Sequence, residues 1–167
     1  MSSTKDNLKA AFAGESQASR KYTYFSEKAD KEDLKQVARL FRAAAEAETV
    51  HARNHLREMG GIGSTKDNLA AAIAGEHYEF TQMYPDFIKQ AEAEKIAGAR
   101  NSFDQANKVE QIHHSLYQST LQSVEQGKPP ADEPYFVCQV CGNTVAGKAP
   151  DKCPICSSPQ RLFKRID

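Results

Sequence analysis

STKDNLAAAIAGE, which spans Ser64–Glu76, is a near-copy of STKDNLKAAFAGE, which spans Ser3–Glu15. The two segments lie 61 residues apart and differ at two of thirteen positions. A match of this length indicates that the chain contains two copies of one structural unit. Both copies end in Gly-Glu, and each is followed about 33 residues later by a Glu-x-x-His, at Glu48–His51 and at Glu110–His113. Two helix pairs that each carry one Glu and one Glu-x-x-His form the ligand set of a dinuclear carboxylate site in a four-helix bundle.

Composition excludes several classes of function. The 167 residues are 40% hydrophobic and 26% charged, and Lys+Arg and Asp+Glu both number 22. A net charge of zero offers no basic excess for nucleic acid, and no apolar run is long enough to span a membrane. The polar start MSSTKDN predicts that there is no signal peptide, so we expect a cytoplasmic protein.

The periodicity predicts four long helices. Ser-x-x-Asp capping boxes precede the first and third of them, at Ser3 and Ser64. Pro85 is expected to bend the third helix, and Gly127 to end the fourth. The predicted helices span Thr4–Ala29, Lys31–Met59, Thr65–Glu94 and Lys95–Gln126.

The chain is expected to form two domains. Residues 1–127 would be the mainly α, four-helix domain, and the Pro-rich residues 128–134 a stiff linker. Residues 135–167 are too few for an independent hydrophobic core, so a metal ion must hold them together.

The prediction of a first metal site depends on several Glu and His residues taken together. A lone Glu-x-x-His is weak support, although its spacing puts both side chains on one helix face. Here two such pairs occur at matching places in a repeat, each with a partnered Glu. Glu79 follows Glu76 by about one turn, whereas its counterpart in the first copy is Ala18, so the two metal positions should be inequivalent. Oxygen-rich ligation with one imidazole per metal favours iron or manganese over copper.

The second metal site consists of two Cys-x-x-Cys pairs, at Cys138–Cys141 and Cys153–Cys156. Four thiolates in two knuckles bind one tetrahedral ion. The spacing alone leaves iron and structural zinc equally open.

The order GE…ExxH…GExxE…ExxH followed by CxxCG…CPxC resembles that of the rubrerythrins over essentially the whole chain. The resemblance implies a ferritin-like bundle with two non-haem irons, oxo-bridged when oxidised, and a C-terminal rubredoxin-like module with one iron. It also implies that Glu79 exchanges with His51 as one iron changes oxidation state, and that Tyr22 and Tyr84 lie beside the cluster. The implied ligands are Glu15 and Glu76 as terminal carboxylates, Glu48 and Glu110 as bridges, His51 and His113 as one histidine per iron, Glu79, and Cys138, Cys141, Cys153 and Cys156. One departure is Ser157, where the family often has Gly after the last cysteine.

The resemblance further implies a peroxidase that protects against oxidative stress. Hydrogen peroxide would be the substrate, and electrons from an external donor, rubredoxin or an NAD(P)H-dependent reductase, would pass through the iron at the four cysteines. An iron-oxidising storage protein with a structural zinc tail is the main alternative. A zinc-ribbon interaction module on an inert bundle would leave the paired ligand sets unexplained.

The connection between the repeats predicts the assembly. In ferritin-like bundles such halves pack head to tail, so the third helix must start near the far end of the second. The predicted second helix is about 42 Å long, whereas Gly60–Gly63 reaches only about 14 Å. We therefore expect a domain-swapped homodimer whose diiron sites take ligands from both chains.

Overall fold

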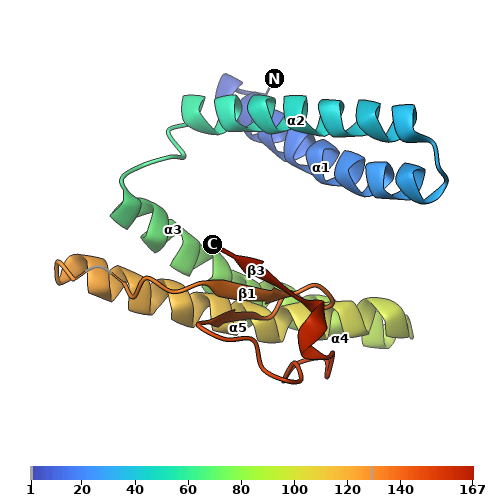
Figure 1. Cartoon of the computed structure of the whole chain (residues 1–167). Coiled ribbons are helices and arrows are strands. Elements are labelled where there is room, and N and C mark those ends of the chain that lie inside the picture. The colour runs from blue at the N-terminus through green and yellow to red at the C-terminus, as the bar shows by residue number, and fades with distance from the viewer. Residues whose placement is uncertain (1, 129) are drawn as a thin grey trace. The chain divides into compact units, whose positions relative to one another are not determined.

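The computed structural model describes residues 2–128 and 130–167; Pro129 of the predicted linker lies outside them. Contacts divide the chain into two compact units, Met1–Gly63 and Ser64–Asp167. Each unit contains a pair of helices packed side by side, as the repeat predicts (Figure 1).

The first unit consists of α1 (Thr4–Lys31) and α2 (Lys35–Glu58). The predicted capping box at the start of α1 is confirmed, because the N–H of Asp6 donates to Ser3 Oγ at 3.2 Å and the N–H of Ser3 donates to the Asp6 carboxylate at 3.0 Å. The same reciprocal pair joins Ser64 and Asp67 in the second unit, with both distances 3.2 Å. These bonds satisfy donors that the first turn of a helix otherwise leaves unpaired.

Small side chains line the contact between α1 and α2. The buried residues with seven-residue spacing are Ser19 and Ser26 of α1, and Ala38, Ala45 and Ala52 of α2. Seven residues are about two helical turns, so each set forms one stripe along its helix. Large apolar residues such as Phe25, Leu34 and Leu40 remain exposed. The pair therefore closes on small residues and leaves its larger apolar side chains uncovered within its own unit.

The turn between the two helices differs from the prediction. The second helix was expected to begin at Lys31, but α1 continues to Lys31 and α2 begins only at Lys35. Asp33, with φ 60°, reverses the chain, and the N–H of Leu34 donates to the Ala29 carbonyl at 2.9 Å. A left-handed residue of this kind lets the last carbonyls of a helix find donors.

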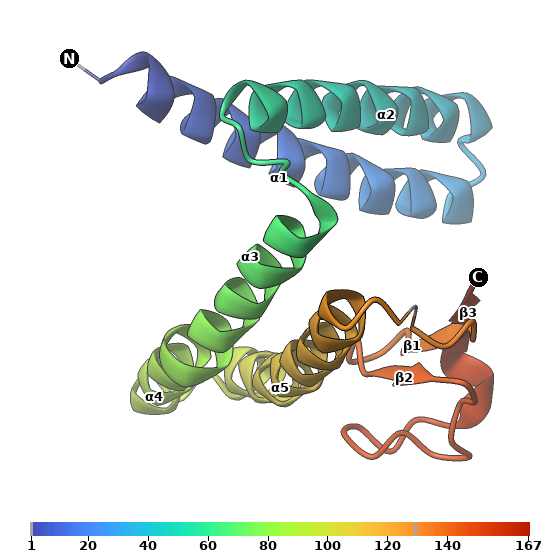
Figure 2. The ribbon, with the colours of Figure 1, turned by 90° about the vertical axis from the view of Figure 1, so that its left-hand side faces the viewer.

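The third predicted helix, Thr65–Glu94, is interrupted. It divides into α3 (Thr65–Tyr78), a π-helical segment η1 (Glu79–Met83) and α4 (Tyr84–Ala93). Both helices lie along α5 (Ala97–Glu125) (Figures 1 and 2). The fourth helix was predicted to begin at Lys95 but begins two residues later, because Lys95 has a left-handed backbone with φ 57°. Gly127, with φ 68°, follows the end of this helix as expected.

The π-helical segment accommodates an extra residue in the second repeat. Glu15 and Glu76 are 61 residues apart, whereas Tyr22 and Tyr84 are 62 apart. The N–H of Tyr84 donates to the carbonyl of Glu79, five residues back. A single π turn is the usual way in which a helix absorbs one inserted residue, often at a functional site.

The repeat extends to a cluster of three aromatic rings in each unit. The rings are Tyr22, Phe25 and Phe41 in the first unit and Tyr84, Phe87 and Phe103 in the second. The centroid distances are 6.2, 6.2 and 5.5 Å in one cluster and 6.3, 6.3 and 5.5 Å in the other. The two helix pairs therefore share packing as well as sequence.

The C-terminal residues form a small antiparallel sheet in the order β2-β1-β3. Its strands are β1 (Tyr135–Cys138), β2 (Thr144–Ala146) and β3 (Phe163–Ile166), and a 3-10 turn, η2 (Gln160–Leu162), precedes β3. β2 contacts α5, so this module packs on the helix pair of its own unit.

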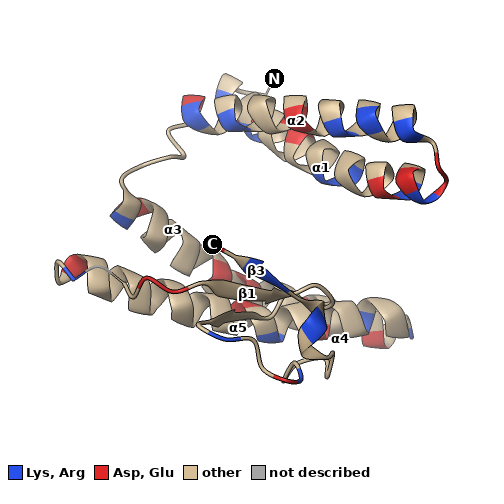
Figure 3. Cartoon of the chain, viewed as in Figure 1, with Lys and Arg blue, Asp and Glu red and all other residues tan. Residues whose placement is uncertain are grey.

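Charges of both signs occur along the helices and on the module (Figure 3). Across residues 2–128 and 130–167, no helix is long and apolar enough to cross a bilayer.

Candidate metal centres

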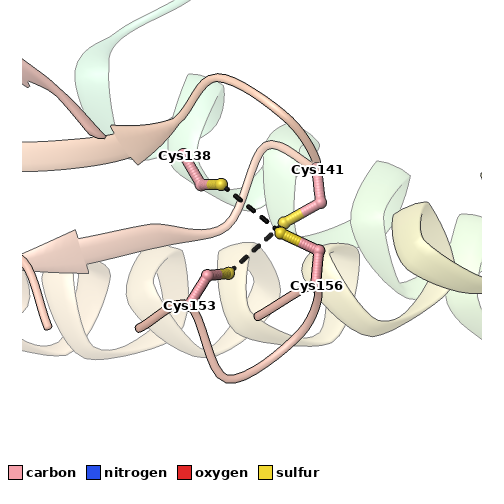
Figure 4. A group of neighbouring side chains, drawn as sticks. All are labelled: Cys138, Cys141, Cys153 and Cys156. Atoms are coloured by element: carbon pink, nitrogen blue, oxygen red, sulfur yellow. Dashed lines mark hydrogen bonds between the residues drawn. The ribbon is translucent and has the colours of Figure 1, made fainter. Parts of the chain in front are cut away.

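Four cysteines gather at the end of β1 and on two facing turns of the C-terminal module (Figure 4). Sγ of Cys138 lies 3.6 Å from that of Cys156, and Sγ of Cys141 lies 3.5 Å from that of Cys153. A tetrahedral ion with metal–sulfur bonds of about 2.3 Å has sulfurs about 3.8 Å apart. The four thiols are therefore arranged to bind one tetrahedral ion.

The two halves of the cysteine cluster have matching backbones. The N–H of Gly142 donates to the Cys138 carbonyl at 2.9 Å, and the N–H of Ser157 donates to the Cys153 carbonyl, also at 2.9 Å. Both residues are left-handed, with φ 81° for Gly142 and 61° for Ser157. Each turn thus carries its second cysteine into the cluster.

Backbone amides point at the sulfurs. The N–H of Asn143 donates to Cys141 and the N–H of Ser158 donates to Cys156, whose Sγ also lies 3.2 Å from the Ser158 hydroxyl. Burial raises the pKa of Cys141. At Cys156 burial is outweighed by hydrogen bonds with Ser158, Cys141 and Cys153, which together lower the pKa to about 6. Such bonds favour the thiolate, which is the form that binds metal.

The first unit brings together Glu15 of α1 with Glu48 and His51 of α2, whose ligand atoms lie within 4.8 Å of one another. His51 Nδ1 lies 2.8 Å from Glu48 Oε2. The His51 side chain is 54% exposed, so these groups stand on the uncovered face of the helix pair.

The second unit brings together Glu76 of α3 with Glu110 and His113 of α5, again within 4.8 Å. His113 Nδ1 lies 2.7 Å from Glu110 Oε2 and 4.0 Å from Glu76 Oε2. The two groups have the same composition and the same histidine nitrogen facing the carboxylates. Each group supplies three ligands, which is half of a dinuclear carboxylate site.

The carboxylates of the second unit strongly affect each other. Burial, together with the neighbouring Glu110, raises the pKa of Glu76 to about 7. Burial opposes ionisation of Glu110 as well, but hydrogen bonds from His113 and Glu76 hold its pKa below the usual range. The bond to Glu110 raises the pKa of His113. Without metal, this site therefore retains protons that a bound cation would displace.

Glu79 and Tyr84 lie beside this group. Burial and then the charge of Glu110 raise the pKa of Glu79, and burial followed by Glu79, Glu110 and Glu76 raises that of Tyr84. Glu79 is the first residue of η1, so the inserted π turn begins at the additional carboxylate. Tyr22 is half-buried within the aromatic cluster of the first unit.

The structure adds a contact for which the sequence gives no pattern. His113 Nε2 lies 2.9 Å from Thr144 Oγ1 in β2 of the module. These residues are 31 positions apart, and neither a repeat nor a motif connects them. The extra carboxylate turn, by contrast, could have been found from the change in repeat spacing from 61 to 62 residues.

Two family descriptions match the chain. "Rubrerythrin" matches residues 6–121, and "Rubrerythrin, rubredoxin-like domain" matches residues 136–164. The chain is 38% identical to rubrerythrin-1 of Clostridium acetobutylicum, over 96% of this chain and 93% of that protein. It is also 38% identical to rubrerythrin of Porphyromonas gingivalis, over 98% and 90%. A solved structure of nigerythrin in its fully reduced, all-ferrous state is 33% identical over 99% of this chain and 88% of that one, with a TM-score of 0.59.

These matches confirm the predicted fold class, a ferritin-like helical domain followed by a rubredoxin-like module. They also support the predicted cofactors, two irons at the Glu/His groups and one at the cysteines. The chain belongs to the rubrerythrin family.

Proposed function

We propose that this protein reduces hydrogen peroxide to water, taking two electrons and two protons for each peroxide and releasing two waters. The observation that supports this most directly is that one chain carries both kinds of iron site, with a ligand of one hydrogen-bonded to the module that forms the other. When bound, the two irons would store the two electrons, and the single iron at the cysteines would accept them one at a time.

The proposed ligands follow the two groups described above. Glu15 and Glu76 would each bind one iron, Glu48 and Glu110 would bridge the pair, and His51 and His113 would each hold one iron through Nδ1, the nitrogen that faces the carboxylates. Glu79 is proposed as the carboxylate that exchanges with His51, with Tyr22 and Tyr84 beside the cluster. Cys138, Cys141, Cys153 and Cys156 would bind the third iron.

The proposed reaction divides between two domains and depends on an external electron donor. We propose residues 1–127 as the domain that reduces peroxide, 128–134 as a linker and 135–167 as the electron-accepting domain. The sequence has no Gly-x-Gly-x-x-Gly with which to bind a nicotinamide cofactor itself. The electron donor would therefore be external, either a rubredoxin or an NAD(P)H-dependent reductase. We propose the cytoplasm as the location of this reaction.

The test is a stopped-flow experiment on the iron-loaded protein after anaerobic reduction. The visible band of the ferric four-cysteine centre is followed after mixing with equal concentrations of peroxide or dioxygen. We expect rapid recovery with peroxide and slow recovery with dioxygen, and slower recovery with peroxide in Glu79→Ala. Faster recovery with dioxygen than with peroxide would favour an iron-oxidising protein, and no visible band would mean zinc at the cysteines.

We further propose that the active protein is a domain-swapped homodimer. Each helix pair carries half of the ligand set and leaves large apolar side chains uncovered within its own unit. Exposed apolar residues on a helix face require a second layer to cover them. A second copy of the chain would supply that layer and the missing ligands.

The length of the connection supports a second copy. In a ferritin-like bundle α2 and α3 run parallel, joined by a long crossover. If Glu76 lies level with Glu48, Thr65, which is 11 residues before Glu76, lies level with residue 37 of α2. About 21 residues of α2 separate residue 37 from Glu58, so the connection must span about 31 Å along the bundle. The six residues between the helices reach about 24 Å when fully extended.

Alignment with a relative also bears on the length of this connection. The alignment with the C. acetobutylicum rubrerythrin-1 runs over 181 positions but covers only 96% of this 167-residue chain. About 20 positions of that relative therefore have no counterpart here. A shortened crossover in this chain would be one way to lose residues in this number.

A further inference from the structure

We propose that Thr144 is a positioning residue that fixes the ring of His113 for metal binding and ties the rubredoxin-like module to the half of the diiron site that its own unit supplies. The inference deepens the proposed function and rests on it for its role in electron transfer. Its structural content depends only on contacts within the second unit.

The direction of the hydrogen bonds determines the form of the His113 ring. Thr144 Oγ1 lies 3.1 Å from the Gly142 carbonyl, which can only accept, so the hydroxyl donates its proton there. The same oxygen lies 2.9 Å from His113 Nε2 and must accept from it. His113 therefore carries a proton on Nε2, which leaves the lone pair of the neutral ring on Nδ1.

Nδ1 is the nitrogen that faces the carboxylates. It lies 2.7 Å from Glu110 and 4.0 Å from Glu76, at the position where a metal would sit. A histidine that binds metal through one nitrogen generally donates the other N–H to a partner that fixes its tautomer and orientation. Thr144 occupies the place of that partner.

Packing holds the module at this position. A Cβ built on Gly142 would lie 3.8 Å from Cγ1 of Val109, which is one residue before Glu110 and only 2% exposed. Ile155 of the second cysteine turn lines a pocket with Ile112 and Leu116 of α5. Both cysteine turns thus face the helix that carries Glu110 and His113.

The contact connects the four-cysteine cluster to the ligand group Glu76, Glu110 and His113 of the same unit. Gly142 directly follows Cys141, so the chain of bonds runs from Cys141 through the Gly142 carbonyl and the Thr144 hydroxyl to His113. In the first unit, the described residues provide no hydrogen-bond partner for His51 Nε2. Within its own unit, His113 is thus tied to the module through Thr144.

The test compares three variants of the full-length protein. Thr144→Val removes the hydroxyl and keeps the side-chain shape, whereas Thr144→Ser retains the hydroxyl. Thr120→Val makes the same hydroxyl-to-methyl change in the cavity of about 310 Å³ that His113, Thr144 and Thr120 line. An unchanged visible band of the ferric four-cysteine centre would show that the module still folds in each variant.

The first measurement is anaerobic titration with Fe(II) after the cysteine site has been filled. Loss of a partner to a metal-binding histidine weakens metal affinity by about 10- to 100-fold. We therefore expect Thr144→Val to weaken one of the two remaining iron sites by about 10-fold or more. Thr144→Ser and Thr120→Val should bind like the wild type.

The second measurement is NMR of the zinc-loaded protein, which is diamagnetic and cannot react with peroxide. We expect an Nε2–H signal of His113 that is protected from exchange in the wild type and in Thr144→Ser, and lost in Thr144→Val. If Thr144→Val retained both the protected signal and wild-type affinity, the inference would be overturned. Neither readout involves peroxide, so failure of the proposed activity would be seen separately.

Discussion

At the scale of single residues, Ser157 occupies a left-handed position that glycine fills in the matching turn, with φ 61° against 81° for Gly142. The sequence marks Ser157 as a departure because the family often has Gly there, and its positive φ is the conformation that glycine adopts without strain. A residue with a Cβ in this conformation costs about 1 kcal/mol or more.

Replacing Ser157 by Gly should therefore stabilise the rubredoxin-like module by about 1 kcal/mol. The measurement is denaturant unfolding of the iron-loaded protein, followed at the visible band of the ferric four-cysteine centre. Gly142→Ser is the matched control and should destabilise by a similar amount, since its new Cβ would meet Val109 only at an ordinary 3.8 Å. Equal stability of Ser157→Gly and wild type would show that the turn relaxes the strain.

The raised pKa of Glu76 predicts how metal affinity depends on pH. Its pKa of about 7 and the raised pKa of His113 mean that both groups hold protons below neutral pH in the metal-free site. A cation must displace those protons, so affinity rises as pH rises through 7, by about tenfold per pH unit for each proton displaced. Fe(II) or Zn(II) titrations between about pH 5.5 and 8.5 would measure this slope.

The matched variant is Glu76→Gln, which has no proton to lose at that position. This variant should bind the metal more weakly. Its metal affinity should also rise less steeply with pH, because about one proton fewer is displaced on binding. An unchanged slope would mean that the displaced proton comes from another group.

At the scale of elements, the sequence predicted the helices well because their signals are local. The Ser-x-x-Asp capping boxes mark two helix starts, and Gly127 follows the end of α5. Turns were predicted within a few residues of Asp33 and Lys95, but their left-handed conformation was not, because a positive φ is uncommon for any residue other than glycine. Here the N–H bonds that follow each of them, to the carbonyls of Ala29 and Ala91, make up for that cost.

The π-helical segment was missed for a different reason. Pro85 suggested a bend within one continuous helix, whereas the interruption lies just before it, at Glu79–Met83. The informative signal was the extra residue between Glu76 and Tyr84 relative to the first repeat.

Deleting Gln82 should convert η1 into an ordinary turn and leave the protein folded. The second unit would then have the spacing of the first, in which Glu15 and Tyr22 lie on one continuous helix. We expect Tm to change by only a few degrees. Deletion of Lys21 from α1 is the control, because it rotates the following residues by about 100° and should lower Tm by about 10 °C or more. An equal loss in both deletions would argue against a one-residue insertion.

At the scale of the whole molecule, the repeat predicted which residues share a helix pair, and the structure gathers Glu15, Glu48 and His51 in one group. Side chains at fixed spacing on a helix have a defined face, which is why such groups can be predicted. The hydrogen bond between His113 and Thr144 could not be predicted from the sequence, because it depends on how a separate sheet packs on α5. The ligand groups thus follow from periodicity, and the link between the two centres from tertiary packing.

The domain-swapped dimer predicts that two inactive variants restore each other. One carries Glu48→Ala with His51→Ala, and the other carries Glu110→Ala with His113→Ala. Each alone has one damaged half in every site, so neither should bind a diiron pair. In a swapped heterodimer, one bundle would combine both damaged halves, and the other would combine both intact halves.

Random pairing of the two variants after unfolding and refolding together should therefore restore about a quarter of the diiron sites. The measurement is iron bound beyond the single ion at the cysteines, with dimer formation followed by sedimentation. A mixture of the Glu48/His51 variant with Glu15→Ala is the matched control, because both lesions lie in the first unit and no pairing can produce an intact site. If each bundle were formed by a single chain, the complementary mixture would bind no more iron than this control, since every bundle would still contain a damaged half.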